Sequence, residues 1–185
     1  MSSTNRGAER AVYDAYYTSD EDAERLISEL PIDSETVLEP SVGGGAFARA
    51  LRKLDCHVVG VDIDPDASGF SDCDMHICAA FLLCPAARER PYWVVGNPPY
   101  DKAEVHIWHA LDVTGRHVAF LLRLAMLESQ TREALWRGHP PRQVFVLRRR
   151  PRFGGKHVHT GTDSAAYGFF WWDSQYEGPP LLGWI

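Results

Sequence analysis

A glycine-rich turn between a short apolar strand and a helix is the feature that most constrains the fold. Residues 36–38 favour a buried strand, and Gly43, Gly44 and Gly45 follow it. Apolar residues at positions 47, 50, 51 and 54 then share one face of a helix. Glycine permits a tight turn and lets a ligand approach the backbone closely. The segment is therefore expected to form a strand, turn and helix unit with a candidate binding site at the turn.

Further apolar strands alternate with helices along the rest of the chain. Ser19 is expected to cap a helix that runs to Pro31, and Asp101 to cap a helix in which Glu104 completes the capping box. Another helix is expected around residues 127–136. The later strands are expected at residues 57–61, 76–78, 92–95, 118–122, 144–147 and 167–172. This alternation predicts a mostly parallel α/β sheet with an antiparallel edge formed by the last two strands.

Length and composition fit one soluble domain. The 185 residues, 45% of them hydrophobic, can bury one sizeable core, so a single domain over residues 1–185 is expected. No apolar run approaches the roughly 18 residues that a membrane span needs, and the first ten residues are polar. The four cysteines have irregular spacings and no Cys-x-x-Cys pair. The cysteine spacing favours reduced thiols in the cytoplasm and argues against structural zinc. The lack of a long apolar run argues against a membrane partner.

Positive charge is concentrated in one part of the chain. Although the net charge is −6, residues 116–160 contain ten Lys/Arg and only two Asp/Glu. A basic segment in an acidic protein indicates an anionic partner, the alternative being a solvated face. The densest part of this segment contains Arg148, Arg149, Arg150, Arg152 and Lys156.

The glycine turn also fits a nucleotide-binding pattern. Gly43, Gly45 and Ala48 match G-x-G-x-x-A, and Asp62 ends the next expected strand. An acidic side chain at that place hydrogen-bonds the ribose hydroxyls of a nucleoside cofactor. The pattern alone does not separate NAD from another nucleoside cofactor. A turn that only packs the helix on the strand is the alternative.

A second motif, Asn97-Pro98-Pro99-Tyr100, follows the strand expected at residues 92–95. Ligands of open α/β sheets bind at the carboxyl ends of the strands, where this motif lies. The residue before a proline is held in extended geometry, and each proline fixes its own φ. The Asn97 amide is therefore expected to be held rigidly, the alternative being a simple proline turn.

Together the two motifs resemble those of the S-adenosylmethionine-dependent amino-methyltransferases, in particular the compact, phage-associated N6-adenine DNA methyltransferases. The similarity rests on Glu39-Pro40-Ser41-x-Gly43-x-Gly45-x-Phe47 and on Asn97-Pro98-Pro99-Tyr100. Less specific likenesses are Tyr16-Tyr17-Thr18, Asp62-Ile63 and the segment Thr162–Asp173. The resemblance implies a class I methyltransferase fold, which is a Rossmann-like, seven-stranded, mostly parallel sheet with helices on both faces.

The resemblance also implies a cofactor site for S-adenosyl-L-methionine. The cofactor would lie over the glycine turn, with Asp62 at its ribose hydroxyls and with Tyr17 and Thr18 at its methionine end. Phe81 would stack on its adenine, although Ala80 stands where the family places an acidic residue. The cofactor-binding residues expected in this way are Tyr17, Thr18, Glu39, Pro40, Ser41, Gly43, Gly45, Phe47, Asp62, Ile63, Phe81 and Asn97.

Methyl transfer to the N6 amino group of adenine in DNA is the activity that the resemblance implies. The amino lone pair is delocalised into the ring, so the Asn97 oxygen and the Pro98 carbonyl would accept both amino hydrogens to localise it. Tyr100 would stack on the base, and Phe153 would hold the other face of a base extruded from the duplex. The expected catalytic residues are Asn97, Pro98, Pro99 and Tyr100. The residues expected to contact the DNA backbone are Arg148, Arg149, Arg150, Arg152 and Lys156.

Other functions stay open at this point. They are the same fold acting on RNA adenine or on protein glutamine, a non-catalytic nucleic-acid-binding or partner subunit, and an NAD oxidoreductase. Because no separate target-recognition domain is expected, a protein partner is a candidate source of sequence specificity. His106 and His109 lack acidic or cysteine companions, so no metal site is predicted.

Overall fold

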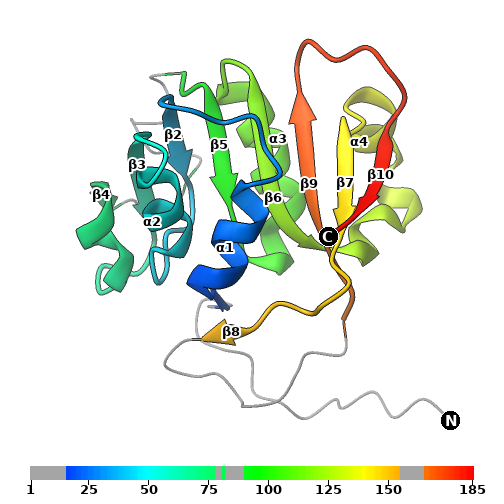
Figure 1. Ribbon diagram of the computed structural model, residues 1–185. Coiled ribbons are helices and arrows are strands. Elements are labelled where there is room, and N and C mark those ends of the chain that lie inside the picture. The colour runs from blue at the N-terminus through cyan, green and yellow to red at the C-terminus, as the bar shows by residue number, and fades with distance from the viewer. Residues whose placement is uncertain (1–15, 78–80, 82–89, 155–164) are drawn as a thin grey trace, which may run out of the picture.

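Eight strands form one sheet in the computed structural model, which describes residues 16–77, 81, 90–154 and 165–185. Their order is β10-β7-β9-β6-β5-β2-β3-β4 (Figure 1). Neighbouring strands are parallel except at β9, which runs antiparallel to β6 and to β7. The strands are β2 (Thr36–Glu39), β3 (His57–Asp62), β4 (Asp74–Ile77), β5 (Trp93–Gly96), β6 (His117–Arg123), β7 (Gln143–Val146), β9 (Tyr167–Asp173) and β10 (Leu181–Trp184).

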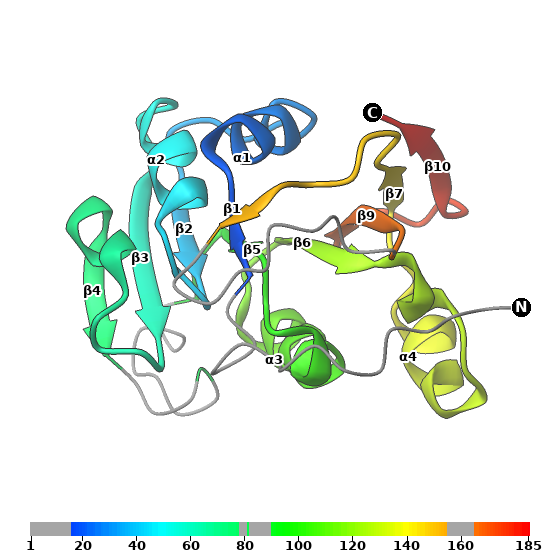
Figure 2. The same ribbon diagram turned by 90° about the horizontal axis from the view of Figure 1, so that it is seen from below.

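Helices cover both faces of this sheet. Helices α1 (Asp20–Ile27) and α2 (Ala46–Arg52) lie on one face, and α3 (Ala103–Val113) and α4 (Glu133–Gly138) lie on the other (Figure 2). A separate hydrophobic cluster fills each face. Strands β5 and β6 are buried on both sides, which explains their continuous apolar sequences. The 3-10 helices are η2 (Ser68–Asp72), η5 (Tyr100–Lys102), η6 (Leu124–Leu127) and η7 (Gln130–Arg132).

A second, two-stranded sheet lies beyond the carboxyl ends of the parallel strands. It consists of β1 (Tyr17–Thr18) and β8 (Phe153–Gly154), which pair antiparallel with Tyr17 opposite Gly154 and Thr18 opposite Phe153. Figure 1 shows β8 below these strand ends. Segments from opposite ends of the sequence are thus joined beside the site described below.

The mostly parallel α/β sheet is confirmed, whereas several local predictions are wrong. Ser19 caps α1 as predicted, since its side chain accepts from the Asp22 amide. Asp101 caps no helix, because Tyr100–Lys102 forms a 3-10 turn first and α3 begins at Ala103 without a side-chain cap. The helix predicted around residues 127–136 begins only at Glu133.

The sheet edge also differs from the prediction. Strand β9 does pair antiparallel with β7, but it lies inside the sheet, between β6 and β7. The edge strand is β10, which brings the sheet to one strand more than the predicted seven. Leu54 falls outside the predicted helix face, because α2 ends at Arg52 and Leu54 is 36% exposed.

No helix among the described residues is long and apolar enough to cross a membrane.

A buried histidine sits at the amino end of β6. His117 is 5% exposed and its ring stacks on Trp93 with the centroids 4.1 Å apart. Trp171 Nε1 donates to His117 Nδ1 at 3.3 Å, so this nitrogen carries no proton and the ring is neutral. Burial lowers the pKa of His117 to about 4, which the nearby Asp173 carboxylate opposes only in part.

Stability is therefore expected to fall as the pH drops below the ordinary histidine range. Between pH 6.5 and about 4 the unfolded chain binds a proton at His117 that the folded chain does not. Lowering the pH from 7 to 5 should cost about 2 kcal/mol of unfolding free energy through this residue. Urea unfolding at both pH values measures the loss. His117→Gln, whose amide oxygen can still accept from Trp171, should remove most of it, and an equal loss in the variant would contradict this assignment.

Candidate active site

The turn after β2 and the loop after β5 meet at the centre of the sheet edge. Glu39 Cγ and Pro40 Cδ lie 3.5 and 3.6 Å from the position that a Gly96 Cβ would take. Strand β2 has β3 on one side and β5 on the other, so the order of strands reverses here. Such a reversal leaves a crevice at the carboxyl ends of the strands. The two sequence motifs are thus brought together as predicted.

Asp62, at the end of β3, holds the glycine turn. Its Oδ2 accepts from the Gly43 amide at 2.8 Å, and its Oδ1 accepts from the Asp64 amide at 2.9 Å. Burial raises the pKa of Asp62, and these backbone hydrogen bonds lower it in part. Each carboxylate oxygen has a further lone pair, so the group can still accept from a ligand hydroxyl.

Two glycines of the turn have backbones or neighbours that exclude a side chain. Gly43 has φ +49°, and a Cβ on it would lie 2.8 Å from the Tyr17 ring. Gly45 has φ +76°, and a Cβ on it would lie 2.6 Å from the Cα of Gly69 in η2. Glycine is therefore required at both positions because neighbouring parts of the chain, the Tyr17 ring and Gly69, leave no room for a side chain.

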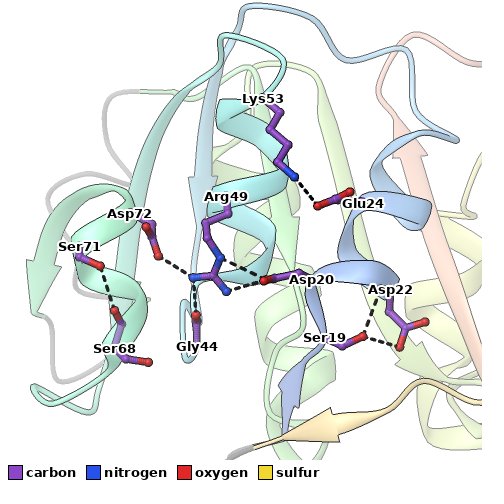
Figure 3. A network of polar contacts seen from close by, with 10 residues as sticks. All are labelled: Ser19, Asp20, Asp22, Glu24, Gly44, Arg49, Lys53, Ser68, Ser71 and Asp72. Atoms are coloured by element: carbon purple, nitrogen blue, oxygen red, sulfur yellow. Dashed lines mark hydrogen bonds and ion pairs between the residues drawn. The ribbon is translucent and has the colours of Figure 1, made fainter.

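An arginine of α2 ties the turn to its surroundings (Figure 3). Arg49 donates to the Asp20 carboxylate at 2.6 and 3.1 Å, to the Gly44 carbonyl at 2.9 Å and to Asp72 Oδ2 at 2.6 Å. The hydrogen bond to Asp20 is the main cause that raises the pKa of Arg49. Sequence reasoning missed this residue, because its three partners come together only in the folded chain.

Glu39 and Phe47 lie deeper than the turn. Glu39 is 1% exposed, and burial followed by the nearby Asp62 charge raises its pKa well above the usual value. It accepts from the Ala48 amide at the start of α2, while its Oε2 has no hydrogen-bond partner among the described residues. Phe47 stacks on Phe169 in the core, with the centroids 6.3 Å apart. The side chains of both residues, which were predicted to bind the cofactor, are therefore buried beneath the turn.

The remaining predicted cofactor residues do not gather at this turn, because Phe81 packs in the hydrophobic cluster on the other face of the sheet. Ser41 Oγ donates to the Pro40 carbonyl at 2.7 Å, and Ile63 is 51% exposed. Phe81 is 5% exposed and packs on His106 and His109 of α3, with centroids 5.6 and 4.5 Å apart. Ala80 lies outside the described residues. Among the described residues, no group of three or more His, Cys, Asp or Glu could hold a metal ion.

The Asn97 amide has a fixed orientation. Its Nδ2 donates to the Tyr16 carbonyl at 2.8 Å and to Thr18 Oγ1 at 3.2 Å. A carbonyl oxygen only accepts, so these contacts identify the nitrogen and leave Oδ1 on the other side of the amide. Asn97 Oδ1 is buried and accepts no hydrogen bond from the described residues. It is one of several buried polar atoms of the described residues without such a partner, and as an amide oxygen it can accept from a donor that a ligand brings.

Aromatic rings gather beside this amide. Tyr16 stacks on Tyr100 with the centroids 5.8 Å apart, and Phe153 contacts both rings edge-on at 5.7 and 6.3 Å. Tyr167 of β9 completes the cluster, and the Arg123 guanidinium lies 4.9 Å from the centre of the Tyr100 ring. Burial raises the pKa of Tyr100 well above 10, and the Asn97 side chain opposes this only in part.

A cavity of about 250 Å³ adjoins the Asn97–Tyr100 loop. Its lining combines aromatic and apolar side chains with one acidic and two cationic ones, which suits a small planar group with polar edges. Sequence reasoning assigned no role to Arg123 or Arg132, whose positions at the end of β6 and in η7 gave no local signal. The lining residues are Tyr16, Tyr100, Asp101, Ala103, Arg123, Ala125, Met126 and Arg132.

The predicted basic surface follows β7 and leads into β8. Arg148, Arg149, Arg150 and Arg152 are all exposed. Arg149 donates to Glu21 at 2.6 Å, and the Arg152 amide donates to the buried Asp22 carboxylate at 2.9 Å. These contacts join the segment to α1 and thereby bring Phe153 to the aromatic cluster. Lys156 lies outside the described residues.

Solved structures of similar fold include methyltransferases. PH1948 from Pyrococcus horikoshii, assigned as an RNA methyltransferase, has a TM-score of 0.65 at 13% identity over 91% of this chain and 92% of that chain. An RNA methyltransferase from Salinibacter ruber in complex with S-adenosyl-L-homocysteine has a TM-score of 0.56 at 12% identity over 88% and 95%. A dimethyladenosine transferase from Plasmodium falciparum has a TM-score of 0.58 at 13% identity over 84% and 61%.

No protein-family model matches the sequence, and no curated protein matches it. At such low identities the likeness to solved structures shows the fold alone. The chain has the class I methyltransferase fold, as the sequence predicted.

Substituting Gly45 should destabilise the turn strongly. Gly45→Ala places a side chain on a left-handed backbone and against Gly69, so we expect a loss of at least about 2 kcal/mol of unfolding free energy. Urea unfolding measures it. Gly138→Ala is the matched control, because nothing lies within 4 Å of its Cβ position, and it should change stability by less than about 0.5 kcal/mol. Equal effects of the two variants would show that the turn tolerates a side chain.

Proposed function

We propose that this protein transfers a methyl group from S-adenosyl-L-methionine to the N6 amino group of adenine in DNA. The buried, unpartnered oxygen of Asn97 carries the proposal. An amino group attached to a flat ring supplies the hydrogen-bond donor that this oxygen lacks. The rings of Tyr16 and Tyr100 lie beside this amide and line a cavity, so they would stack on a flat ring that enters there.

The residues around the glycine turn fit the proposed cofactor. When bound, S-adenosyl-L-methionine supplies an electrophilic methyl group on a sulfonium centre. The Gly43–Gly45 backbone would hold it, and Asp62 has lone pairs left for ribose hydroxyls. A structure of the same fold contains the related S-adenosyl-L-homocysteine, which supports this choice of cofactor.

For the proposed reaction, the protein has to localise the lone pair of the adenine amino group on its nitrogen. Asn97 Oδ1 would accept one amino hydrogen, since the bonds from Nδ2 to Tyr16 and Thr18 fix the amide, and the Pro98 carbonyl would accept the other. These acceptors are in place before the reaction, so they need no reorganisation as positive charge develops on the nitrogen. Because Asn97 Oδ1 is covered in this structure, one of the surrounding rings has to move to admit a base.

Nucleic acid is the proposed substrate because exposed arginines lead to the site. Arg148, Arg149, Arg150 and Arg152 lie on the segment that ends at Phe153 in the aromatic cluster. They would contact phosphates and add affinity without sequence selection. RNA adenine is the second candidate, since the structures of similar fold include RNA methyltransferases and a dimethyladenosine transferase.

Removing the Asn97 amide should abolish methyl transfer. We expect Asn97→Ala to lower kcat by about 10²–10³-fold, the effect of deleting one preorganised polar group in other active sites. Binding of S-adenosyl-L-homocysteine, measured by calorimetry, should stay within about two-fold. A variant whose kcat stays close to that of the unmodified protein would contradict the catalytic assignment.

The substrate is identified by parallel assays with labelled S-adenosyl-L-methionine. Duplex DNA, single-stranded DNA, RNA and a protein extract are each incubated with the protein and with Asn97→Ala. Label in DNA as N6-methyladenine supports the proposal, and label in RNA adenine supports the second candidate. Label in protein glutamine would overturn both and identify a protein methyltransferase. Absence of both methyl transfer and cofactor binding would also overturn both, and would favour a non-catalytic binding subunit.

The exposed arginines should account for part of the salt dependence of DNA binding. Replacing Arg148 and Arg150 with alanine should reduce the slope of log K against log salt by about 2. Arg52→Ala with Arg137→Ala removes the same charge from exposed positions on α2 and α4 and should leave the slope unchanged. Fluorescence anisotropy with a labelled duplex measures both. Equal slopes for the two double variants would place the binding surface elsewhere.

A further inference from the structure

Strand β1 lies between the two halves of the candidate site. Successive side chains of a strand point to opposite faces. The Tyr17 ring packs against Gly43 of the glycine turn, whereas Tyr16 and Thr18 face the Asn97–Tyr100 loop. One short strand therefore contacts both the turn proposed for the cofactor and the amide proposed for the substrate.

The two hydrogen bonds that Asn97 donates to Tyr16 and Thr18 hold the plane of its amide. The terminal torsion of asparagine is broad, so one hydrogen bond alone would let the amide swing. With two acceptors on the same nitrogen, the Tyr16 carbonyl and Thr18 Oγ1, the orientation of the amide is defined. A flipped amide would set Asn97 Oδ1 against the Tyr16 carbonyl oxygen, which cannot donate.

We propose that Thr18 is a positioning residue for Asn97. Its hydroxyl oxygen accepts from Asn97 Nδ2 and so keeps Oδ1 aimed at the amino group of the substrate. The catalytic part of this inference rests on the proposed function. It differs from the role implied by the family resemblance, in which Thr18 contacts the methionine end of the cofactor.

Three variants separate these two roles. Thr18→Val keeps the shape and strand preference of the side chain but removes the acceptor. Thr18→Ser restores a hydroxyl and should rescue the loss. Thr36→Val is the matched control, because Thr36 is an exposed strand threonine at the start of β2.

The hydrogen bond between Thr18 and Asn97 can be tested by NMR, without an activity assay. The sequence contains two asparagines, Asn5 and Asn97, so asparagine-selective ¹⁵N labelling gives two pairs of side-chain amide proton signals, and Asn97→Ala assigns them. We expect Thr18→Val to shift the Asn97 amide protons and speed their exchange with solvent. Thr18→Ser and Thr36→Val should leave them near their original positions. Unchanged Asn97 signals in Thr18→Val would overturn the inference.

Kinetics then test whether the contact matters for the reaction. Loss of one neutral hydrogen bond corresponds to about a 3- to 10-fold decrease in kcat, with the KM for S-adenosyl-L-methionine and the Kd for S-adenosyl-L-homocysteine changed by less than about two-fold. Thr18→Ser should recover most of kcat.

The opposite pattern would overturn the positioning role. A raised Kd for S-adenosyl-L-homocysteine in Thr18→Val, with kcat unchanged, would assign Thr18 to the cofactor instead. If the unmodified protein transfers no methyl group to any acceptor, the proposed function fails, and the catalytic role of Thr18 fails with it. The amide signals distinguish that result from loss of the Thr18–Asn97 contact.

Discussion

The reversal of strand order between β2 and β5 is the constraint on which the site depends. The chain leaves β2 toward α2 on one face of the sheet and leaves β5 toward α3 on the other face (Figure 2). The turn after β2 and the loop after β5 therefore meet at the place where open α/β sheets bind their ligands. Because both strands are parallel and adjacent, Gly43 and Asn97 meet at one edge although they are far apart in the sequence.

Hydrogen bonds of buried and half-buried side chains join the segments around the candidate site. Arg49 joins the glycine turn to α1 and η2, and the buried Asp22 carboxylate accepts from the Ser19 hydroxyl and from the Arg152 amide (Figure 3). A buried carboxylate is tolerated where donors surround it, and these donors come from separate segments. The tether to Arg152 holds β8 against β1, so that Phe153 and Tyr16 reach Tyr100.

The parts of the fold that could be predicted have a local signal of sufficient length. The strands β2, β5 and β6 are apolar runs, and the glycine turn and the two prolines mark where strands end. Strands β1 and β8 have two residues each, which is too short to show a period, and they exist because they pair with each other. Strand β10 is the apolar run Leu181–Trp184, which has a glycine inside it and no alternation of apolar and polar residues, so it lacks the pattern of a half-buried strand.

The sequence by itself determined the α/β sheet, the position of both motifs at strand ends and the residue types that suit an amino-group acceptor. These follow from apolar periodicity and from the restricted backbones of glycine and proline, which act within a few residues. Only the tertiary structure decided which way the Asn97 amide points, that Asp62 holds the glycine turn, and that Arg49, Arg123 and Arg132 belong to the site. Hydrogen bonds between distant segments fix these features, and no local pattern encodes such partners.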